Sequence, residues 1–296
     1  MEFTGNIYTS GTAGPAAPPR RRAIRPAGPL LSERTNAETL GFFEWLFGQV
    51  QLDFGAYRVG PLLRRLPACL RFLRASDIPA AVRRLDAYPA LIPSVVSTAL
   101  LGVTRFHRDQ AVFDAIADHV LPELLLGGPK VRVWSAACSD GPELYSVAML
   151  IEEAGRLARA ELIGSDCRPD AIRRAVAGLY PVAALENFSS CRRSEHFVTV
   201  RDGLVQVNDS LRAAVNWRVS DLLTGAIPGE WDLVLWRNMS IYLTPAAADR
   251  CWETVTNPLR VGGFLVTGKA DHPPASLPLR RVAPCIYKKT SGVRHA

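Results

Sequence analysis

The sequence predicts an α/β protein in which a small helical domain precedes a larger domain built on a parallel β-sheet. After the turn at residues 127–129, apolar strand-like runs alternate with helical runs, a pattern that indicates a parallel sheet with helical crossovers. Before that turn the periodic segments are all helical and are interrupted by prolines. A chain of 296 residues with 48% hydrophobic residues can form one large core and one small core.

The N-terminal part of the chain divides into a tail and a helical domain. Residues 1–34 are rich in Gly, Pro, Ala and Arg and have hardly any apolar periodicity, so we expect a flexible tail. From Asn36, a plausible helix cap, apolar residues recur at helical spacing. The helical domain, expected over residues 35–108, contains four helical segments at 36–50, 57–74, 77–87 and 91–101.

Residues 109–290 supply the elements of the larger domain. The predicted order is helix 109–125, strand 131–135, helix 141–156, strand 161–166, helix 169–178, strand 231–236, helix 245–259 and strand 264–268. Residues from about 180 to 220 interrupt this rhythm with a short alternating segment at 197–207, which predicts a small antiparallel β insertion. The strand and helix order indicates a sheet wound in the Rossmann manner.

Composition narrows the class of protein. The longest apolar runs are far shorter than the roughly 20 residues that span a bilayer, and the N-terminus lacks the apolar core of a secretory signal, so we expect a cytoplasmic protein without a membrane segment. The six cysteines form no C-x-x-C pair and the five histidines are scattered, so we expect neither disulfides nor a metal site.

The net charge of +7 is concentrated in the N-terminal part, where residues 49–110 hold nine arginines and four aspartates. Such a basic segment could meet an acidic partner, although a solvated arginine-rich helix surface would look the same. We expect no nucleic-acid partner, and the oligomeric state is left open.

The segment after the first predicted strand carries the first sign of a ligand site. Residues 135–141 are small side chains apart from Asp140, and they precede a helix, so a ligand could approach the backbone amides near Ala137 and Ser139. Asp166 ends the second strand, where a carboxylate of a nucleotide-binding sheet accepts hydrogen bonds from ribose hydroxyls. The alternative is that Asp166 caps the helix at 169–178. Because no phosphate-binding motif is present, the pattern favours a nucleoside such as S-adenosylmethionine over NAD or ATP.

Several motifs resemble those of one known family. Residues 104–109 resemble the motif T-x-F-F-R-D, residues 134–149 resemble W-S-A-G-C-S-T-G-E-E-P-Y-S-x-A-M, residues 236–243 resemble R-N-V-x-I-Y-F, and residues 262–269 resemble the start of G-G-x-L-x-x-G-H-S-E. These are motifs of the chemotaxis receptor glutamate O-methyltransferases, the CheR-type family, and the resemblance runs from about Leu52 to Lys269.

The resemblance implies a fold, a cofactor and a set of site residues. The fold would be a Rossmann-like class I methyltransferase sheet, and the cofactor S-adenosylmethionine. By position, Thr104, Arg108 and Glu143 would meet the methionine end of the cofactor, Asp166 the ribose, Asp221 and Leu222 the adenine side, and Asn238 and Met239 the region near the sulfonium. Tyr242 and Arg108 would steer the acceptor, with Asn238 beside them as a further candidate catalytic residue.

Some positions depart from the family motifs. The Asn that the family has two residues before the T-x-F-F-R-D motif is Gly102 here, and the second Phe of that motif is His107. The family's G-E-E-P-Y reads Gly-Pro-Glu-Leu-Tyr at residues 141–145, and the first residue of its N-L-L segment near the adenine is Asp221. Its G-H-S-E reads Gly-Lys-Ala-Asp at 268–271.

The departures leave three functions open. The first is methyl transfer to a protein carboxylate or to another small nucleophile, which would yield S-adenosylhomocysteine. The second is a biosynthetic self-reaction of S-adenosylmethionine that cyclises its aminocarboxypropyl chain and releases methylthioadenosine. The third is a non-catalytic module that binds S-adenosylmethionine.

Overall fold

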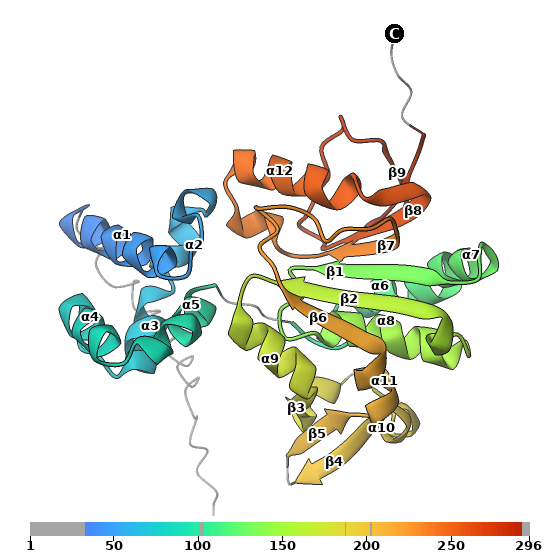
Figure 1. Cartoon of the computed structure of the whole chain (residues 1–296), viewed down its shortest axis with the longest axis horizontal. Coiled ribbons are helices and arrows are strands. Elements are labelled where there is room, and N and C mark those ends of the chain that lie inside the picture. The colour runs from blue at the N-terminus through green and yellow to red at the C-terminus, as the bar shows by residue number, and fades with distance from the viewer. Residues whose placement is uncertain (1–32, 101–103, 187, 202, 292–296) are drawn as a thin grey trace, which may run out of the picture.

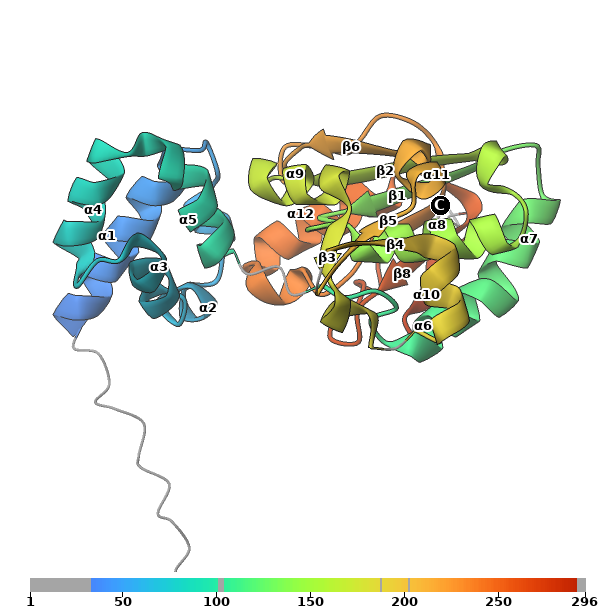
Figure 2. The same ribbon diagram turned by 90° about the horizontal axis from the view of Figure 1, so that it is seen from below.

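A computed structural model of the chain describes residues 33–100, 104–186, 188–201 and 203–291. The predicted tail at residues 1–34 lies almost entirely outside the described residues, and so does Gly102. Figures 1 and 2 show a group of helices beside a larger unit built around a twisted sheet. The predicted α/β class is confirmed, with a central sheet that is mostly parallel and a separate small antiparallel sheet.

The helices that precede the sheet, here called the helical unit, occupy residues 33–99. They are α1 (Glu33–Gly48), α2 (Val59–Leu63), α3 (Leu66–Leu73), α4 (Ile78–Ala87) and α5 (Ile92–Ala99), with 3₁₀ turns at Phe54–Ala56 and Pro89–Leu91. The helix predicted over 57–74 is two helices, because a break at Arg65 separates α2 from α3 and Pro67 lies in the first turn of α3. Asp77 caps α4 by accepting a hydrogen bond of 2.8 Å from the N–H of Ala80.

The central sheet has the strand order β6-β2-β1-β7-β8-β10-β9. Its strands are β1 (Val131–Ala136), β2 (Ala160–Asp166), β6 (Val215–Val219), β7 (Trp231–Trp236), β8 (Leu259–Thr267), β9 (Leu279–Ala283) and β10 (Ile286–Lys289). The pairs from β6 to β8 are parallel, whereas β10 runs antiparallel to β8 and to β9. The strand β6, which falls in the segment predicted as an insertion, belongs to this sheet, and β9 and β10 were not predicted.

Among the described residues, seven further helices pack against the central sheet or the small antiparallel sheet. They are α6 (Gln110–Ala115), α7 (Leu121–Leu126), α8 (Pro142–Glu153), α9 (Pro169–Ala177), α10 (Ser190–His196), α11 (Asp209–Ala214) and α12 (Pro245–Thr256). The helix predicted over 109–125 is α6 and α7 with a π-helical turn, Ile116–Val120, between them. Pro122 at the start of α7 cannot donate a backbone hydrogen bond, which explains why the regular helix is interrupted there.

The predicted β insertion is a three-stranded antiparallel sheet. Its order is β3 (Leu179–Pro181), β5 (Leu204–Val207) and β4 (Phe197–Arg201). The alternating segment at 197–207 forms the hairpin of β4 and β5, as expected. In Figure 1 this small sheet lies below the central sheet, next to α10 and α11.

The helical unit attaches to the loop between β7 and α12. Tyr57 and Leu243 form an isolated antiparallel bridge, with hydrogen bonds of 2.8 Å from the Arg58 N–H to the Tyr242 carbonyl and from the Thr244 N–H to the Ala56 carbonyl. One hydrophobic cluster continues from α1 and α3 through α12 to the sheet, and includes Phe43, Leu73, Trp236 and Trp252. The backbone bridge and the shared core fix the helical unit over the end of β7.

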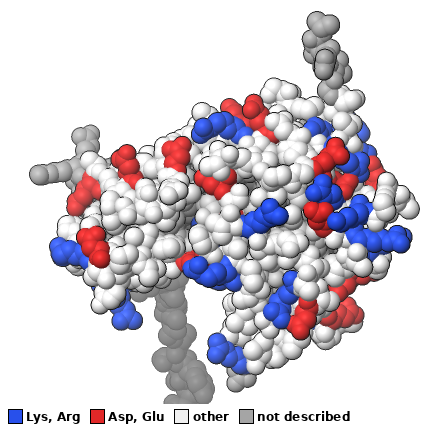
Figure 3. All heavy atoms as spheres, in the orientation of Figure 1, with Lys and Arg blue, Asp and Glu red and all other residues white. Residues whose placement is uncertain are grey.

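Charged side chains of both signs are distributed over the face shown in Figure 3. The arginine excess of residues 49–110 therefore does not form a single basic patch on that face, and three of these arginines, Arg64, Arg65 and Arg108, line a cavity. Within the part of the chain that the structure describes, no helix is long and apolar enough to cross a membrane.

Candidate functional site

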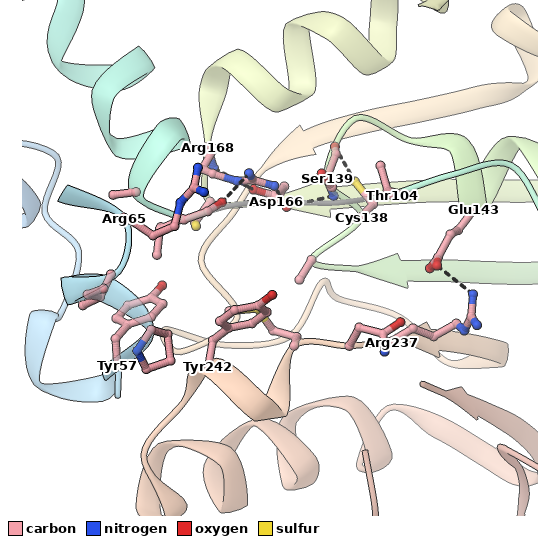
Figure 4. A pocket seen from close by; sticks show the side chains of 18 of the residues that line it. Tyr57, Arg65, Thr104, Cys138, Ser139, Glu143, Asp166, Arg168, Arg237 and Tyr242 are labelled. Atoms are coloured by element: carbon pink, nitrogen blue, oxygen red, sulfur yellow. Dashed lines mark hydrogen bonds and ion pairs between the residues drawn. The ribbon is translucent and has the colours of Figure 1, made fainter. Parts of the chain in front are cut away.

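A cavity of about 360 Å³ lies between the helical unit and the loops that follow β1, β2 and β7. In open α/β sheets, ligands bind beyond the carboxyl ends of the strands, which is where this cavity lies. Figure 4 shows Tyr57 and Arg65 approaching it from the helical unit, and Asp166, Arg168 and Tyr242 from the sheet side. The site therefore needs both parts of the chain.

The loop after β1 presents its backbone to the cavity. Ala137, Ser139 and Gly141 have positive φ angles of 53°, 54° and 92°. Gly141 is required because a side chain there would place a Cβ 2.5 Å from the ring of Trp217. Left-handed conformations are costly for Ala and Ser, and such strained residues concentrate at functional sites.

Asp166 ends β2 and is almost fully buried. Its carboxylate accepts hydrogen bonds from the Ser139 N–H at 2.9 Å and from the Arg168 N–H at 3.0 Å. It also accepts from Nε and Nη2 of Arg168 at 2.8 and 3.1 Å. The alternative in which Asp166 caps α9 is wrong, since the N-cap residue of α9 is Arg168.

A buried ion-pair network forms the wall opposite Asp166. The side chain of Arg237 is fully buried, and its guanidinium lies 2.6 Å from Glu143 and 2.8 Å from Asp109. Lys269 lies 2.9 Å from the other oxygen of Asp109. Burial raises the pKa of Glu143, and the charge of Arg237 opposes that rise. The network holds Glu143 at the cavity wall.

The loop after β7 is shaped by one buried carboxylate. Asp271 accepts hydrogen bonds from the N–H groups of Asn238, Ser240 and Gly268 and from the hydroxyl of Ser240. These bonds hold Asn238 at a positive φ of 57°. Met239 and Tyr242 follow on the same loop, and the ring of Tyr242 points into the cavity in Figure 4.

Three polar atoms beside the cavity are buried and have no hydrogen-bond partner among the described residues. They are Oγ1 of Thr104, Oγ of Ser139 and Oδ1 of Asn238. Buried polar atoms are normally paired, and an unpaired one costs about 1–3 kcal/mol. Their grouping around one cavity indicates a polar ligand.

Comparison with known proteins identifies the family. Residues 102–280 match the model of the CheR methyltransferase S-adenosylmethionine-binding domain. The chain belongs to the CheR methyltransferase family. A chemotaxis protein methyltransferase of Listeria monocytogenes is 30% identical over 242 residues, which cover 81% of this chain and 92% of that protein. A chemotaxis protein methyltransferase of Vibrio parahaemolyticus is 31% identical over 251 residues, which cover 81% of this chain and 90% of that protein.

Among solved structures, the N-methyltransferase NodS of Bradyrhizobium japonicum, bound to S-adenosyl-L-homocysteine, is 16% identical. The match covers 54% of this chain and 63% of NodS, with a TM-score of 0.31. The glycopeptide N-methyltransferase MtfA, complexed with sinefungin, is 12% identical over 51% of this chain and 48% of its own, with a TM-score of 0.32.

Family membership makes this protein an S-adenosylmethionine-dependent enzyme of the methyltransferase type. The chemistry of the cavity fits the cofactor. The Asp166 carboxylate suits hydroxyl donors, Glu143 suits an ammonium, and the arginines suit a carboxylate. The unpaired oxygens of Thr104, Ser139 and Asn238 belong to residues of the same cavity wall.

Most predicted CheR-type site residues come together in the structure. Those that line the cavity are Thr104, Arg108, Ala137, Ser139, Glu143, Asp166, Asn238, Met239 and Tyr242. Asp221 and Leu222, which follow β6, are not among the lining residues. The Asp221 carboxylate accepts the N–H of Leu223 at 2.9 Å, and Leu222 packs against the hydrophobic core.

Several residues of the cavity wall were not predicted as site residues, among them Tyr57, Arg65, Arg168 and Arg237. Tyr57 and Arg65 reach the site only because the helical unit folds onto the β7–α12 loop. A signal for Arg168 exists in the sequence, because a basic residue two positions after the predicted ribose carboxylate can fold back onto it.

Proposed function

We propose that this enzyme transfers a methyl group from S-adenosylmethionine to a carboxylate on a protein. Its relatives are named chemotaxis protein methyltransferases, which supports methyl transfer. The observation that carries the proposal is the charge of the cavity. Five arginines line it (Arg64, Arg65, Arg108, Arg168 and Arg237) against two acidic residues, Glu143 and Asp166.

The charge balance favours an anionic acceptor. The residues that line the cavity carry five positive and two negative charges, so positive charge is in excess around it. The cofactor brings a further net positive charge. A carboxylate acceptor would complement the positive electrostatic potential of the cavity and the cofactor, whereas a neutral amine or a cation would not.

S-adenosylmethionine supplies a methyl group already activated on a sulfonium. A carboxylate is already an anion, so the protein needs no strong general base, and positioning does most of the work. Arg108 can fork onto a carboxylate and orient it. The hydroxyl and ring of Tyr242 would hold the acceptor in line and face the sulfonium cation.

The lining residues support the following cofactor roles. Thr104 and Glu143 would hold the methionine end, Asp166 the ribose, and Asn238 and Met239 the region near sulfur. For the adenine side, Asp221 and Leu222 remain predictions. The domain division is part of the proposal, with residues 35–108 closing over the cofactor-binding residues 109–290. We place the enzyme in the cytoplasm, where its six cysteines, all free in the structure, would stay reduced.

The test separates methyl transfer from the two other functions. Purified protein is incubated with methyl-labelled S-adenosylmethionine, with and without the protein fraction of the source cell. We expect S-adenosylhomocysteine and labelled protein only when the acceptor fraction is present. The label should be released as methanol by mild base, because methyl esters hydrolyse there and N-methyl groups do not.

Other products would contradict the proposal. Methylthioadenosine formed without any acceptor would show self-reaction of the cofactor. A base-stable label would show a nitrogen or sulfur acceptor. Cofactor binding without any sulfur product would show a non-catalytic module.

A further inference from the structure

The carboxylate of Asp166 is fully engaged by the protein itself. A carboxylate offers about four lone-pair directions, and Asp166 accepts four hydrogen bonds, three of them from Arg168 and one from Ser139. Two of the four come from the guanidinium, one to each carboxylate oxygen. Ribose hydroxyls would need the same directions.

The guanidinium is also fixed from a second side. Its Nη1 donates a hydrogen bond of 2.8 Å to the carbonyl of Leu100, just after α5. The side chain is only 7% exposed, and it lies between Asp166 and the helical unit in Figure 4. Hydrogen bonds on two sides therefore fix the Arg168 side chain at the predicted ribose end of the cavity, in contrast to a mobile surface arginine.

We propose that Arg168 competes with the ribose of S-adenosylmethionine for Asp166 and thereby sets the affinity of the cofactor. The inference rests on the proposed role of Asp166 toward the ribose. When the nucleoside binds, its two hydroxyls take the acceptor directions that Nε and Nη2 hold, and the guanidinium turns away from Asp166. The two backbone N–H groups of Ser139 and Arg168 continue to hold the carboxylate.

A competing Arg168 and a supporting Arg168 predict opposite changes in cofactor affinity when the residue is removed. Without the guanidinium, Asp166 in the free protein is a buried charge with only two backbone donors, so the free protein is destabilised. The bound form regains its partners from the ribose. Removing Arg168 should therefore tighten cofactor binding. If Arg168 instead stayed in place and oriented Asp166 for the ribose, its removal would weaken binding.

The experiment measures binding of S-adenosylhomocysteine by calorimetry, so it does not depend on turnover. We expect Arg168→Ala to bind about five- to thirtyfold more tightly than the wild type, because the two guanidinium hydrogen bonds to Asp166 no longer compete with the ribose. The matched control is Arg174→Ala, on the helix α9 that follows Arg168, where Arg174 pairs with Asp140 and is half exposed. The control should bind as the wild type does.

Two nucleosides locate the effect at the ribose. Adenosine should show the same gain in affinity with Arg168→Ala, and 2′,3′-dideoxyadenosine should show none. An equal gain for both nucleosides, or weaker binding of S-adenosylhomocysteine by Arg168→Ala, would overturn the proposal. Should the Ala variant fail to fold, Arg168→Gln removes the charge with less loss of packing, and the same outcomes apply. A wild-type protein that binds no S-adenosylhomocysteine would refute the cofactor assignment itself.

Discussion

Glu143 and Arg237 are 94 positions apart in the chain, yet the carboxylate of one lies 2.6 Å from the guanidinium of the other. Glu143 comes from the first turn of α8, and Arg237 follows the last residue of β7. Their ion pair joins the loops after β1 and β7, so it links two strand ends that border the cavity. This link has a measurable consequence for stability.

Arg237→Ala should lower the free energy of unfolding by about 3–5 kcal/mol, because it leaves the buried Glu143 without its countercharge and removes a partner of Asp109. Urea denaturation measures the change. Arg250→Ala is the control, since Arg250 is 60% exposed and 3.9 Å from Asp53, and it should change stability by less than about 0.5 kcal/mol. A loss below about 1 kcal/mol in Arg237→Ala would show that the pair contributes little.

Asp166→Ala should weaken S-adenosylhomocysteine binding by about 1.5–3 kcal/mol, the range for losing hydrogen bonds to a charged acceptor. Calorimetry measures the affinity. Asp166→Asn keeps one acceptor oxygen and should lose less. Asp209→Ala, on the exposed surface of α11, serves as the control. Unchanged affinity in a folded Asp166→Ala protein would remove the ribose role.

Tyr242→Phe should keep cofactor affinity within a few-fold while turnover falls about ten- to a thousandfold, as expected when an interaction made mainly in the transition state is lost. Tyr242→Ala should lose more, because the aromatic face goes with the hydroxyl. Turnover and melting temperature are measured on the same samples. Normal turnover with a lowered melting temperature would reduce Tyr242 to a packing residue.

His107→Phe should make the protein more resistant to acid. Burial lowers the pKa of His107 from 6.5 to about 4, and its ring stacks on Phe113 at 5.0 Å. Between pH 6.5 and 4 the unfolded chain binds a proton at this residue that the folded protein does not, so stability falls as the pH falls. Phe cannot be protonated and keeps the ring contact.

Denaturation at pH 7 and pH 5 checks this prediction. The free energy of unfolding of His107→Phe, relative to that of the wild type, should be larger at pH 5 than at pH 7. His119→Phe, an exposed position, is the control and should show no such rise. A constant difference between variant and wild type at both pH values would contradict the predicted effect.

The sequence alone determined the elements whose signals are local. Alternating apolar runs and proline starts located β1, β2, β7, α8, α9 and α12 to within a few residues, and the small side chains before α8 marked the cofactor loop. The end of a strand is a local feature too, so Asp166 and Asn238 could be predicted at the edge where ligands bind. Family motifs added Thr104, Arg108, Glu143 and Tyr242, all of which line the cavity.

Only the tertiary structure decided which residues far apart in the chain lie in contact. The strand β6 gains its place from pairing with β2, and Tyr57 and Arg65 reach the cavity because a backbone bridge fixes the helical unit to the β7–α12 loop. Glu143 lies against Arg237, 94 positions away, because a buried charge is stable only with a partner within a few ångströms. Periodicity and spacing carry no record of such pairings, since they depend on three-dimensional proximity and on the desolvation of charge.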